Sequence, residues 1–308
     1  MMHAYFYRES CILRRSSEIL SLKIADAIRY ATERLVQAGI QDARLDAEVL
    51  LFHILERDRA WLITHTNDAL DNERRALFED WIGRRAQREP LQYIIGKQEF
   101  WGLEFAVTPD VLIPRPETEL VVESAVKIIG SAGSQTTIVD LCTGSGCIAI
   151  SLAKELGDTR IFAADTSSQA LAVARGNARK HGVSERIRFL EGDLFEPLGE
   201  LDLRGRVDVI TANPPYIRSD DLPRLQPEVR DYEPEIALRA GPDGTEVQHR
   251  IIENAPRFLR KNGVLIMEMG LGQAEALRTM AENTGSYAAI EIFKDLARIE
   301  RVIVAHKK

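Results

Sequence analysis

Residues 137–149 read Thr-Ile-Val-Asp-Leu-Cys-Thr-Gly-Ser-Gly-Cys-Ile-Ala, which is an apolar run, a glycine loop and the start of an apolar helix. Gly144 and Gly146 allow the backbone to approach a ligand closely, with the N-terminus of the helix behind it. This order predicts the first strand–loop–helix unit of a doubly wound α/β sheet, whose ligand lies at the carboxyl edge of the strands.

Strand and helix patterns continue to alternate after this unit. We expect strands at 137–141, 160–164, 186–190, 207–212, 263–268, 288–293 and 300–305, and helices at 147–155, 167–181, 246–259 and 272–282. Alternation at this spacing predicts a mostly parallel sheet of seven strands with helices on its faces. The last two strands are joined by a short connection and can form an antiparallel pair at the edge of the sheet.

The first third of the chain has a different character. Residues 22–88 carry apolar side chains at helical spacing, with Asp71 or Asn72 as a helix cap, and predict a small helical domain. Residues 93–96 and 100–107 read as short strands around glycine turns. The expected domains are a disordered extension at 1–20, a helical domain at 21–89, a β-hairpin linker at 90–116 and a catalytic domain at 117–308.

The composition disfavours several classes of protein. The 308 residues have a formal net charge of −7, which argues against a protein that coats nucleic acid through bulk charge. No stretch is apolar over the ~18 residues that a membrane span needs. The three cysteines are too few for a disulfide framework and the six histidines lack zinc-ligand spacing. We therefore expect reduced thiols, a cytoplasmic location and no metal.

Polar side chains stand at the predicted carboxyl ends of four strands, in the order Asp140, Asp165, Asp193 and Asn213. Asp165 is placed to accept hydrogen bonds from both hydroxyls of a ribose, and Asp193 from an adenine amino group while Leu194 packs on the ring. Asp140 can organise the glycine loop or meet an ammonium group, and its carboxylate would repel a pyrophosphate. This series favours an S-adenosylmethionine pocket over a dinucleotide site. The loop adds further candidate cofactor-binding residues, which are Cys142, Thr143, Gly144, Ser145 and Gly146.

Asn213-Pro214-Pro215-Tyr216 follows the apolar run at 207–212 and lies where a strand opens into a loop. The two prolines fix φ and remove two backbone donors, so the carbonyl oxygens around them stay available as acceptors. With the side-chain oxygen of Asn213, they can hold both hydrogens of a planar –NH2 group and leave its lone pair directed at an electrophile. All four residues are therefore candidate catalytic and substrate-binding residues.

Taken together, these motifs resemble the HemK/PrmC-like family, the methyltransferases that modify the glutamine side chain of peptide chain release factors. The resemblance covers nearly everything from Leu22 onward. It rests on Pro-Arg-Pro-Glu-Thr-Glu at 114–119, the loop at 140–149, Asn-Pro-Pro-Tyr at 213–216 and Val-Arg-Asp-Tyr-Glu-Pro-Glu at 229–235. Cys142 departs from the family, in which glycine is more usual. Its Cβ would crowd the loop unless φ stays negative, and its thiol is expected to touch the cofactor without being chemically active.

The resemblance implies an α/β fold of the Rossmann-like class I S-adenosylmethionine-dependent methyltransferases, with S-adenosylmethionine as cofactor. It also implies the methyl acceptor, the glutamine of the Gly-Gly-Gln motif of release factors. We assign the helical domain to docking of that protein. Phe100 and Arg115 become candidates for shaping the slot of the glutamine side chain. We expect a monomer that contacts no membrane and binds no nucleic acid directly.

Three other readings use part of the same pattern. An adenine-amine methyltransferase of DNA or RNA shares Asn-Pro-Pro-Tyr, but it must flip a base and would be expected to have a basic face. A dinucleotide-dependent oxidoreductase would use the same glycines and Asp165, but it leaves residues 213–216 unexplained. A non-catalytic binding module would not need an intact Asn213.

Overall fold

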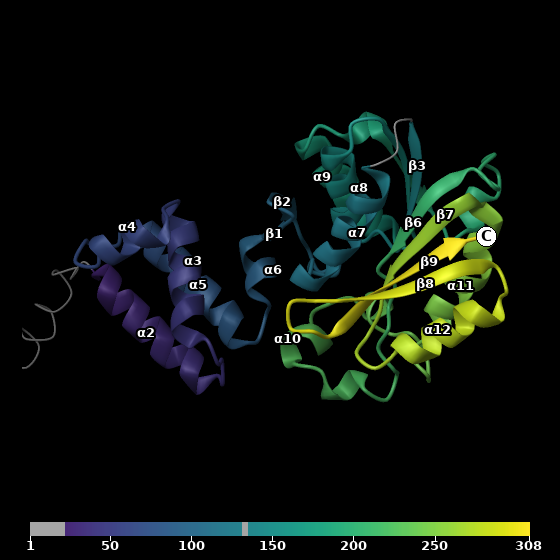
Figure 1. Ribbon diagram of the computed structural model, residues 1–308. Helices are drawn as coiled ribbons and strands as arrows, with labels where there is room; N and C mark the ends of the chain where they lie inside the picture. The colour runs from purple at the N-terminus through teal and green to yellow at the C-terminus, as the bar shows by residue number, and fades with distance from the viewer. Residues whose placement is uncertain (1–21, 131–134) are drawn as a thin grey trace, which may run out of the picture. The chain divides into compact units, whose positions relative to one another are not determined.

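The computed structural model describes residues 22–130 and 135–308. The chain divides into two compact units, one up to Ile95 and one from Gly96 onward, and each unit has its own hydrophobic core. In Figure 1 the first unit runs from purple to blue and the second from blue-teal to yellow. The boundary at Ile95 falls a few residues after the end of the helical region that the sequence pattern predicts.

The N-terminal unit is made of helices that pack their apolar faces together. They are α2 (Ile24–Gln37), α3 (Ala43–Leu55), α4 (Arg59–Thr64), α5 (Asn72–Ala86) and α6 (Leu91–Ile95). Asp71 is the N-cap of α5, where its Oδ1 accepts a hydrogen bond from the N–H of Arg74 at 2.8 Å. The shared core includes Leu35, Leu50, Leu51 and Ile82.

The strand expected at 93–96 is wrong, because this segment belongs to helix α6. The N–H groups of Tyr93 and Ile94 both donate to the carbonyl of Pro90 at 3.1 Å, which closes a helical turn. Both side chains are buried, and Ile94 lies in the core of the helical unit. Packing against neighbouring helices therefore outweighs the β-propensity of the segment.

A β-hairpin begins the second unit. Strands β1 (Lys97–Phe100) and β2 (Leu103–Ala106) pair antiparallel around a turn at Trp101 and Gly102. Phe100 and Phe105 are buried in a cluster with side chains of the neighbouring helices, and their rings meet edge to face with centroids 6.1 Å apart. The hairpin expected around the glycine turn is therefore confirmed, and it packs as part of the second unit's core.

The second unit is built on a seven-stranded sheet with the order β5-β4-β3-β6-β7-β9-β8. Its strands are β3 (Thr136–Leu141), β4 (Thr159–Asp165), β5 (Ile187–Glu191), β6 (Val207–Ala212), β7 (Leu259–Glu268), β8 (Tyr287–Lys294) and β9 (Glu300–Lys307). The first five are parallel, and β9 runs antiparallel to both β7 and β8. The mostly parallel sheet and the antiparallel pair at its edge are confirmed.

Helices cover both faces of this sheet (Figure 1). They are α7 (Glu119–Ile129), α8 (Cys147–Glu155), α9 (Ser168–Lys180), α11 (Glu246–Phe258) and α12 (Ala274–Asn283), and a short helix α10 (Pro227–Arg230) lies in the segment after β6. One core lies between the sheet and helices α11 and α12, and the other lies between the sheet, α7 and α8. The chain proceeds outward from β3 to β5 and then returns to β6 on the other side of β3, so a topological switch point lies between β3 and β6.

Candidate functional site

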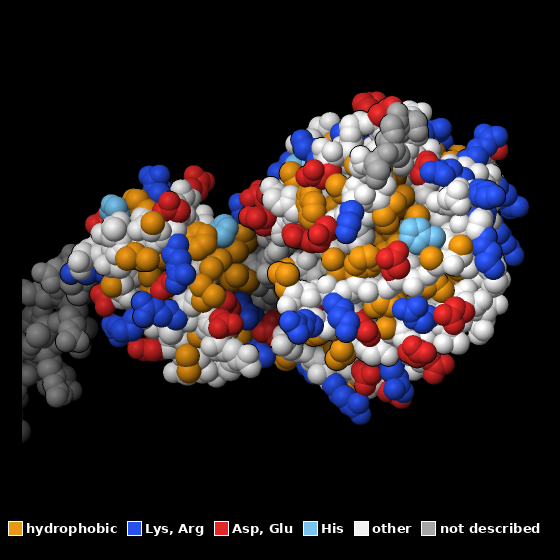
Figure 2. Space-filling model, viewed as in Figure 1, with side chains coloured by type: hydrophobic (Ala, Val, Ile, Leu, Met, Phe, Trp, Pro, Cys, Tyr) orange, Lys and Arg blue, Asp and Glu red, His pale blue; other side chains and the backbone are white. Residues whose placement is uncertain are grey.

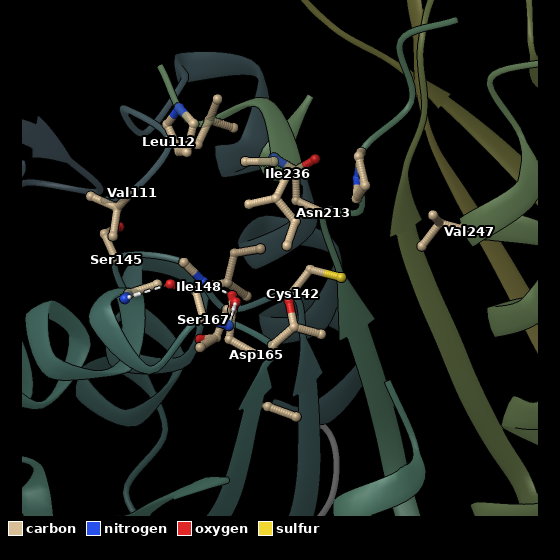
Figure 3. A pocket seen from close by; sticks show the side chains of 18 of the residues that line it. Val111, Leu112, Cys142, Ser145, Ile148, Asp165, Ser167, Asn213, Ile236 and Val247 are labelled. Carbon is tan, nitrogen blue, oxygen red and sulfur yellow. Dashed lines mark hydrogen bonds between the residues drawn. The ribbon is translucent and has the colours of Figure 1, made fainter. Parts of the chain in front are cut away.

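A cavity of about 360 Å³ opens at the carboxyl edge of the sheet. Its walls come from the glycine loop after β3, the ends of β4, β5 and β6, the segment 234–250, and residues 111–119, which we call the strap. Figure 3 shows Leu112 of the strap and Asp165 of β4 on opposite sides of this cavity. The position agrees with the rule that ligands of open α/β sheets bind at the switch point.

Most of the residues predicted from sequence line this cavity together. These are Arg115, Cys142, Thr143, Gly144, Ser145, Asp165, Asp193, Leu194, Asn213 and Pro215. Five other predicted residues are not among those that line it, namely Phe100, Asp140, Gly146, Pro214 and Tyr216.

Asp165 fixes the glycine loop. Its Oδ2 accepts a hydrogen bond from the N–H of Gly144 and its Oδ1 accepts one from the N–H of Ser167, both at 2.9 Å. Burial raises the pKa of this carboxyl group, and the backbone donors oppose that shift. Each carboxylate oxygen still has a lone pair for a hydroxyl group in the cavity.

Asn177 of α9 ties the glycine loop to the hairpin. Its Nδ2 donates to the carbonyl of Ser145 at 3.0 Å and to the carbonyl of Ala106 at 3.1 Å. Its Oδ1 accepts from the N–H of Ala106 at 2.8 Å. The side chain is fully buried, so one carboxamide holds two segments that lie about 40 residues apart in the chain.

A residue other than glycine at position 146, at the start of α8, would be destabilising for two reasons, its backbone conformation and its close neighbours. The φ of Gly146 is +82°, and a Cβ there would lie 2.9 Å from Ile150 Cδ1 and 3.1 Å from Ala174 Cβ. Gly144 has a similar positive φ of +54°, but a Cβ there would meet nothing within 4 Å. We expect Gly146→Ala to lower the free energy of unfolding by about 2–4 kcal/mol, and Gly144→Ala by only about 1 kcal/mol. Urea unfolding of both variants measures the difference, and equal losses would contradict the packing argument.

Asp140 is fully buried and does not reach the cavity. Its Oδ2 accepts a hydrogen bond from the hydroxyl of Thr143 at 2.6 Å, and its Oδ1 accepts one from Thr211 at 2.8 Å. Burial raises the pKa of its carboxyl group to about 7. Of the two roles expected for Asp140, the contact with Thr143 agrees with the one in the glycine loop. Thr211, which completes this arrangement from β6, was not predicted.

Cys142 lines the cavity with φ at +57°. The left-handed conformation explains why glycine suits this position better, since a residue with a Cβ is held there at a cost of about 1–3 kcal/mol. Burial raises the pKa of the thiol well above its ordinary value, which favours the protonated form of the sulfur.

Asp193 and Leu194 form the wall at the end of β5. Asp193 pairs with Arg250 of α11, and both residues line the cavity. Arg250 was not predicted, because only the fold brings α11 against this strand end. An ion pair at the rim leaves further lone pairs of the Asp193 carboxylate available to a ligand.

The strap is anchored by a buried carboxylate. Glu233 pairs with Arg115 and also accepts a hydrogen bond from the N–H of Ile113 at 3.4 Å. Glu233 is 6% exposed, and burial raises the pKa of its carboxyl group. Arg115 is therefore held by Glu233, whose segment 229–235 lies more than 110 residues further along the chain.

Asn213 is held by the strap, which is in turn hydrogen-bonded to the end of β7. Its Nδ2 donates a hydrogen bond to the hydroxyl oxygen of Thr118 at 3.1 Å, and Thr118 donates to Glu268 Oε2 at 2.6 Å. Thr118 and Glu268 were not predicted, although Glu268 ends a buried strand, which is the position that singled out Asp140 and Asp165.

The sheet order, with the glycine loop after β3 and Asn213–Tyr216 after β6, defines a class I S-adenosylmethionine-dependent methyltransferase fold. A family model described as a methyltransferase domain matches residues 132–302, and one described as the PrmC N-terminal domain matches residues 26–96. The release factor glutamine methyltransferase of Geobacter sulfurreducens is 45% identical over 251 residues, which cover 82% of this chain and 85% of that protein. The chain belongs to the family of release factor glutamine methyltransferases.

Other comparisons agree with this family and fold. The release factor glutamine methyltransferase of Moorella thermoacetica is 40% identical over 287 residues, which cover 93% of this chain and 99% of that protein. The solved structure of the Thermus thermophilus 16S rRNA methyltransferase RsmC, in complex with AdoMet and guanosine, aligns with a TM-score of 0.50 and 18% identity over 69% of this chain and 50% of that one. This second likeness concerns the fold alone. In the part of the chain that the structure describes, no helix is long and apolar enough to cross a membrane.

Proposed function

We propose that this protein transfers a methyl group from S-adenosylmethionine to the side-chain amide nitrogen of the glutamine in the Gly-Gly-Gln motif of peptide chain release factors. The observation that carries the proposal is the placement of Asn213 and Pro215 in the wall of the same cavity as Asp165 and the glycine loop. A donor site and an acceptor site for an amide thereby share one enclosed space. Family membership supports the substrate, and a role in translation termination follows from it.

The residues of the cavity fit the proposed cofactor. Asp165 offers acceptors for ribose hydroxyls, Asp193 offers one for an amino group, and Leu194, Ile148 and Val247 supply apolar surface for a ring. These residues do not need to include a strong base or to hold a metal for this cofactor to donate its methyl group. When bound, S-adenosylmethionine supplies a methyl carbon that is activated by a positively charged sulfur.

Catalysis in this proposal is chiefly positioning. The nitrogen of a carboxamide is a poor nucleophile because its lone pair is delocalised into the carbonyl group. Asn213 Oδ1 and the carbonyl of Pro214 would accept the two N–H groups, so that the nitrogen can become pyramidal and direct its lone pair at the methyl carbon. The strap, with Arg115 held by Glu233, helps exclude water from this space. After transfer the extra proton on nitrogen is acidic and leaves to water.

Mass spectrometry of a release factor treated with the protein and a methyl-labelled donor tests this function. We expect one added methyl group on the glutamine of the Gly-Gly-Gln motif, and none on a release factor in which that glutamine is replaced by alanine. An unmodified release factor, together with methylation of adenine in DNA or RNA, would establish the alternative instead. The net charge of −7 and family membership favour the protein substrate.

We also propose that the helical region 21–89 docks the release factor, that 90–116 serves as the linker and that 117–308 is the catalytic domain. Support comes from exposed apolar side chains on the helical unit, which include Tyr30, Val36, Leu45, Ile63 and Leu77. Figure 2 shows hydrophobic side chains on this unit among basic and acidic ones, a mixture that suits a protein partner. The predicted extension at 1–20 lies outside the described residues.

Ile63 offers a test of docking, since it is 66% exposed and lines a second cavity between α2, α3 and α4. We expect Ile63→Asp to raise the KM for the full release factor by about tenfold, with kcat nearly unchanged, because a docked side chain contributes about 1.5–3 kcal/mol. Leu296→Asp, in the connection between β8 and β9, is the matched control at a fully exposed position. If both variants have the same KM for the release factor, this surface does not dock it.

We further propose that the protein acts as a monomer in the cytoplasm, where release factors work, without direct binding to nucleic acid. The described cysteines are free thiols, Cys147 being buried, which suits a reducing compartment. Sedimentation equilibrium at micromolar concentration tests the oligomeric state, and a dimer mass would contradict it.

A further inference from the structure

A buried line of polar groups stands behind Asn213. It runs from the carboxylate of Glu268 at the end of β7, through the hydroxyl of Thr118 in the strap, to Nδ2 of Asn213. Thr118 is 1% exposed and Glu268 is 2% exposed. Thr118 and Glu268 are 150 residues apart in the chain, and neither was assigned a role by the motifs of the sequence.

The direction of each hydrogen bond in this line follows from the ionisation of Glu268. Burial raises the pKa of its carboxyl group to about 7, so above this pH the group is a carboxylate that only accepts, and the single proton of the Thr118 hydroxyl is then committed to it. The Thr118 oxygen then has only lone pairs to offer, and it can be approached by the NH2 end of Asn213 but not by its carbonyl end.

A rotated Asn213 amide would bring its Oδ1 against the Thr118 oxygen, with no proton between the two atoms. In a buried, low-dielectric position such a contact is repulsive, and it also leaves the NH2 group without its partner. The observed orientation is therefore the favoured one. No described residue donates a hydrogen bond to Asn213 Oδ1, so this oxygen stays available to a ligand in the cavity.

We infer that Thr118 and Glu268 are positioning residues, which set the orientation of the Asn213 carboxamide so that its oxygen, and not its NH2 group, faces the substrate amide. The inference rests on the proposed function, because only an –NH2 acceptor needs an oxygen at this place. An amide presented the other way round would place two donors against each other and could not hold the substrate nitrogen. Thr118 and Glu268 themselves touch neither substrate nor cofactor in this scheme; they act through Asn213.

Substitution of Thr118 tests the inference. Thr118→Val keeps the shape of the side chain and removes the hydroxyl, and we expect kcat for release factor methylation at pH 8 to fall by about tenfold or more. The dissociation constant for S-adenosylmethionine should stay unchanged. Thr118→Ser restores the hydroxyl and should restore kcat. A kcat for Thr118→Val equal to that of the wild type would overturn the inference, while methylation of the wild-type substrate would leave the proposed function in place.

Thr159 provides the matched control. It is a buried threonine at the start of β4, and its hydroxyl has no hydrogen-bond partner among the described residues. Thr159→Val makes the same chemical change away from the site, so kcat should stay at the wild-type value. An equal fall of kcat in both valine variants would assign the effect to packing and would contradict the positioning role.

A second measurement does not depend on activity. In protein labelled with ¹⁵N-asparagine, the side-chain NH2 signal that disappears in Asn213→Ala identifies Asn213. We expect one of its two protons to be protected from exchange with solvent in the wild type and in Thr118→Ser, and to lose this protection in Thr118→Val. Rapid exchange of both protons in the wild type would sink the inference. Protection without any methylation of release factors would instead uphold the orientation and refute the proposed function.

Discussion

Asn213→Ala is expected to lower the rate of release factor methylation by at least about 100-fold, while S-adenosylmethionine binds nearly as well as before. The reason is that Asn213 Oδ1 would contribute where the substrate nitrogen changes shape, and loss of one such preorganised group costs about 10²–10³ in rate. Binding of the donor depends instead on the glycine loop and Asp165, which the substitution leaves intact. Single-turnover methylation and calorimetric titration of the donor measure the two effects separately.

Asn283→Ala is the matched control, since Asn283 is an exposed residue at the end of α12. It should methylate at the wild-type rate. A wild-type rate for Asn213→Ala would show that the amide is held by other groups, and a large loss of donor affinity would show that Asn213 serves the cofactor.

Asp165→Ala should have the second largest effect, and it should act on donor affinity. It removes the carboxylate that is proposed to hold the ribose and also releases the N–H of Gly144 from its partner. We expect the dissociation constant for S-adenosylmethionine to rise by about 10- to 100-fold, which corresponds to about 1–3 kcal/mol. Calorimetric titration measures this change, and kcat at saturating donor should fall far less.

Asp208→Ala separates this effect from a general loss of stability. Asp208 Oδ2 accepts a hydrogen bond from the N–H of Thr137 at 2.8 Å, near the amino ends of β6 and β3. It therefore resembles Asp165 in bonding the backbone but lies at the opposite edge of the sheet. If Asp208→Ala weakens donor binding as much as Asp165→Ala does, the role of Asp165 is structural.

The sequence predicts this fold well because its strongest signals are local. Strand β6 and helix α8 have the predicted bounds, and the glycine loop lies where its spacing places it. Strand β7 begins at Leu259, earlier than expected, because Leu259 pairs with Val207 beyond an irregularity in the register. Helix α6 is the clear error, since burial against other helices decides its conformation.

The site is less predictable because its support comes from residues far apart in the chain. Thr118 meets Glu268, Arg115 meets Glu233, and no local pattern encodes either pair. Phe100 was expected in the substrate slot, yet it lies in the core, where its ring packs on Phe105. A local motif shows which residues share a strand end, but not which side chains the folded sheet places behind them.

The double anchorage of Asn177 has a practical consequence for mutational scans. A change in the hairpin that displaces Ala106 also disturbs the carboxamide that holds the Ser145 carbonyl. Weakened donor affinity after such a change would therefore be no sign that the hairpin touches the donor. The two segments are linked through the single side-chain amide of Asn177. A scan that overlooks this link would attribute to direct contact with the donor an effect that is transmitted through the scaffold.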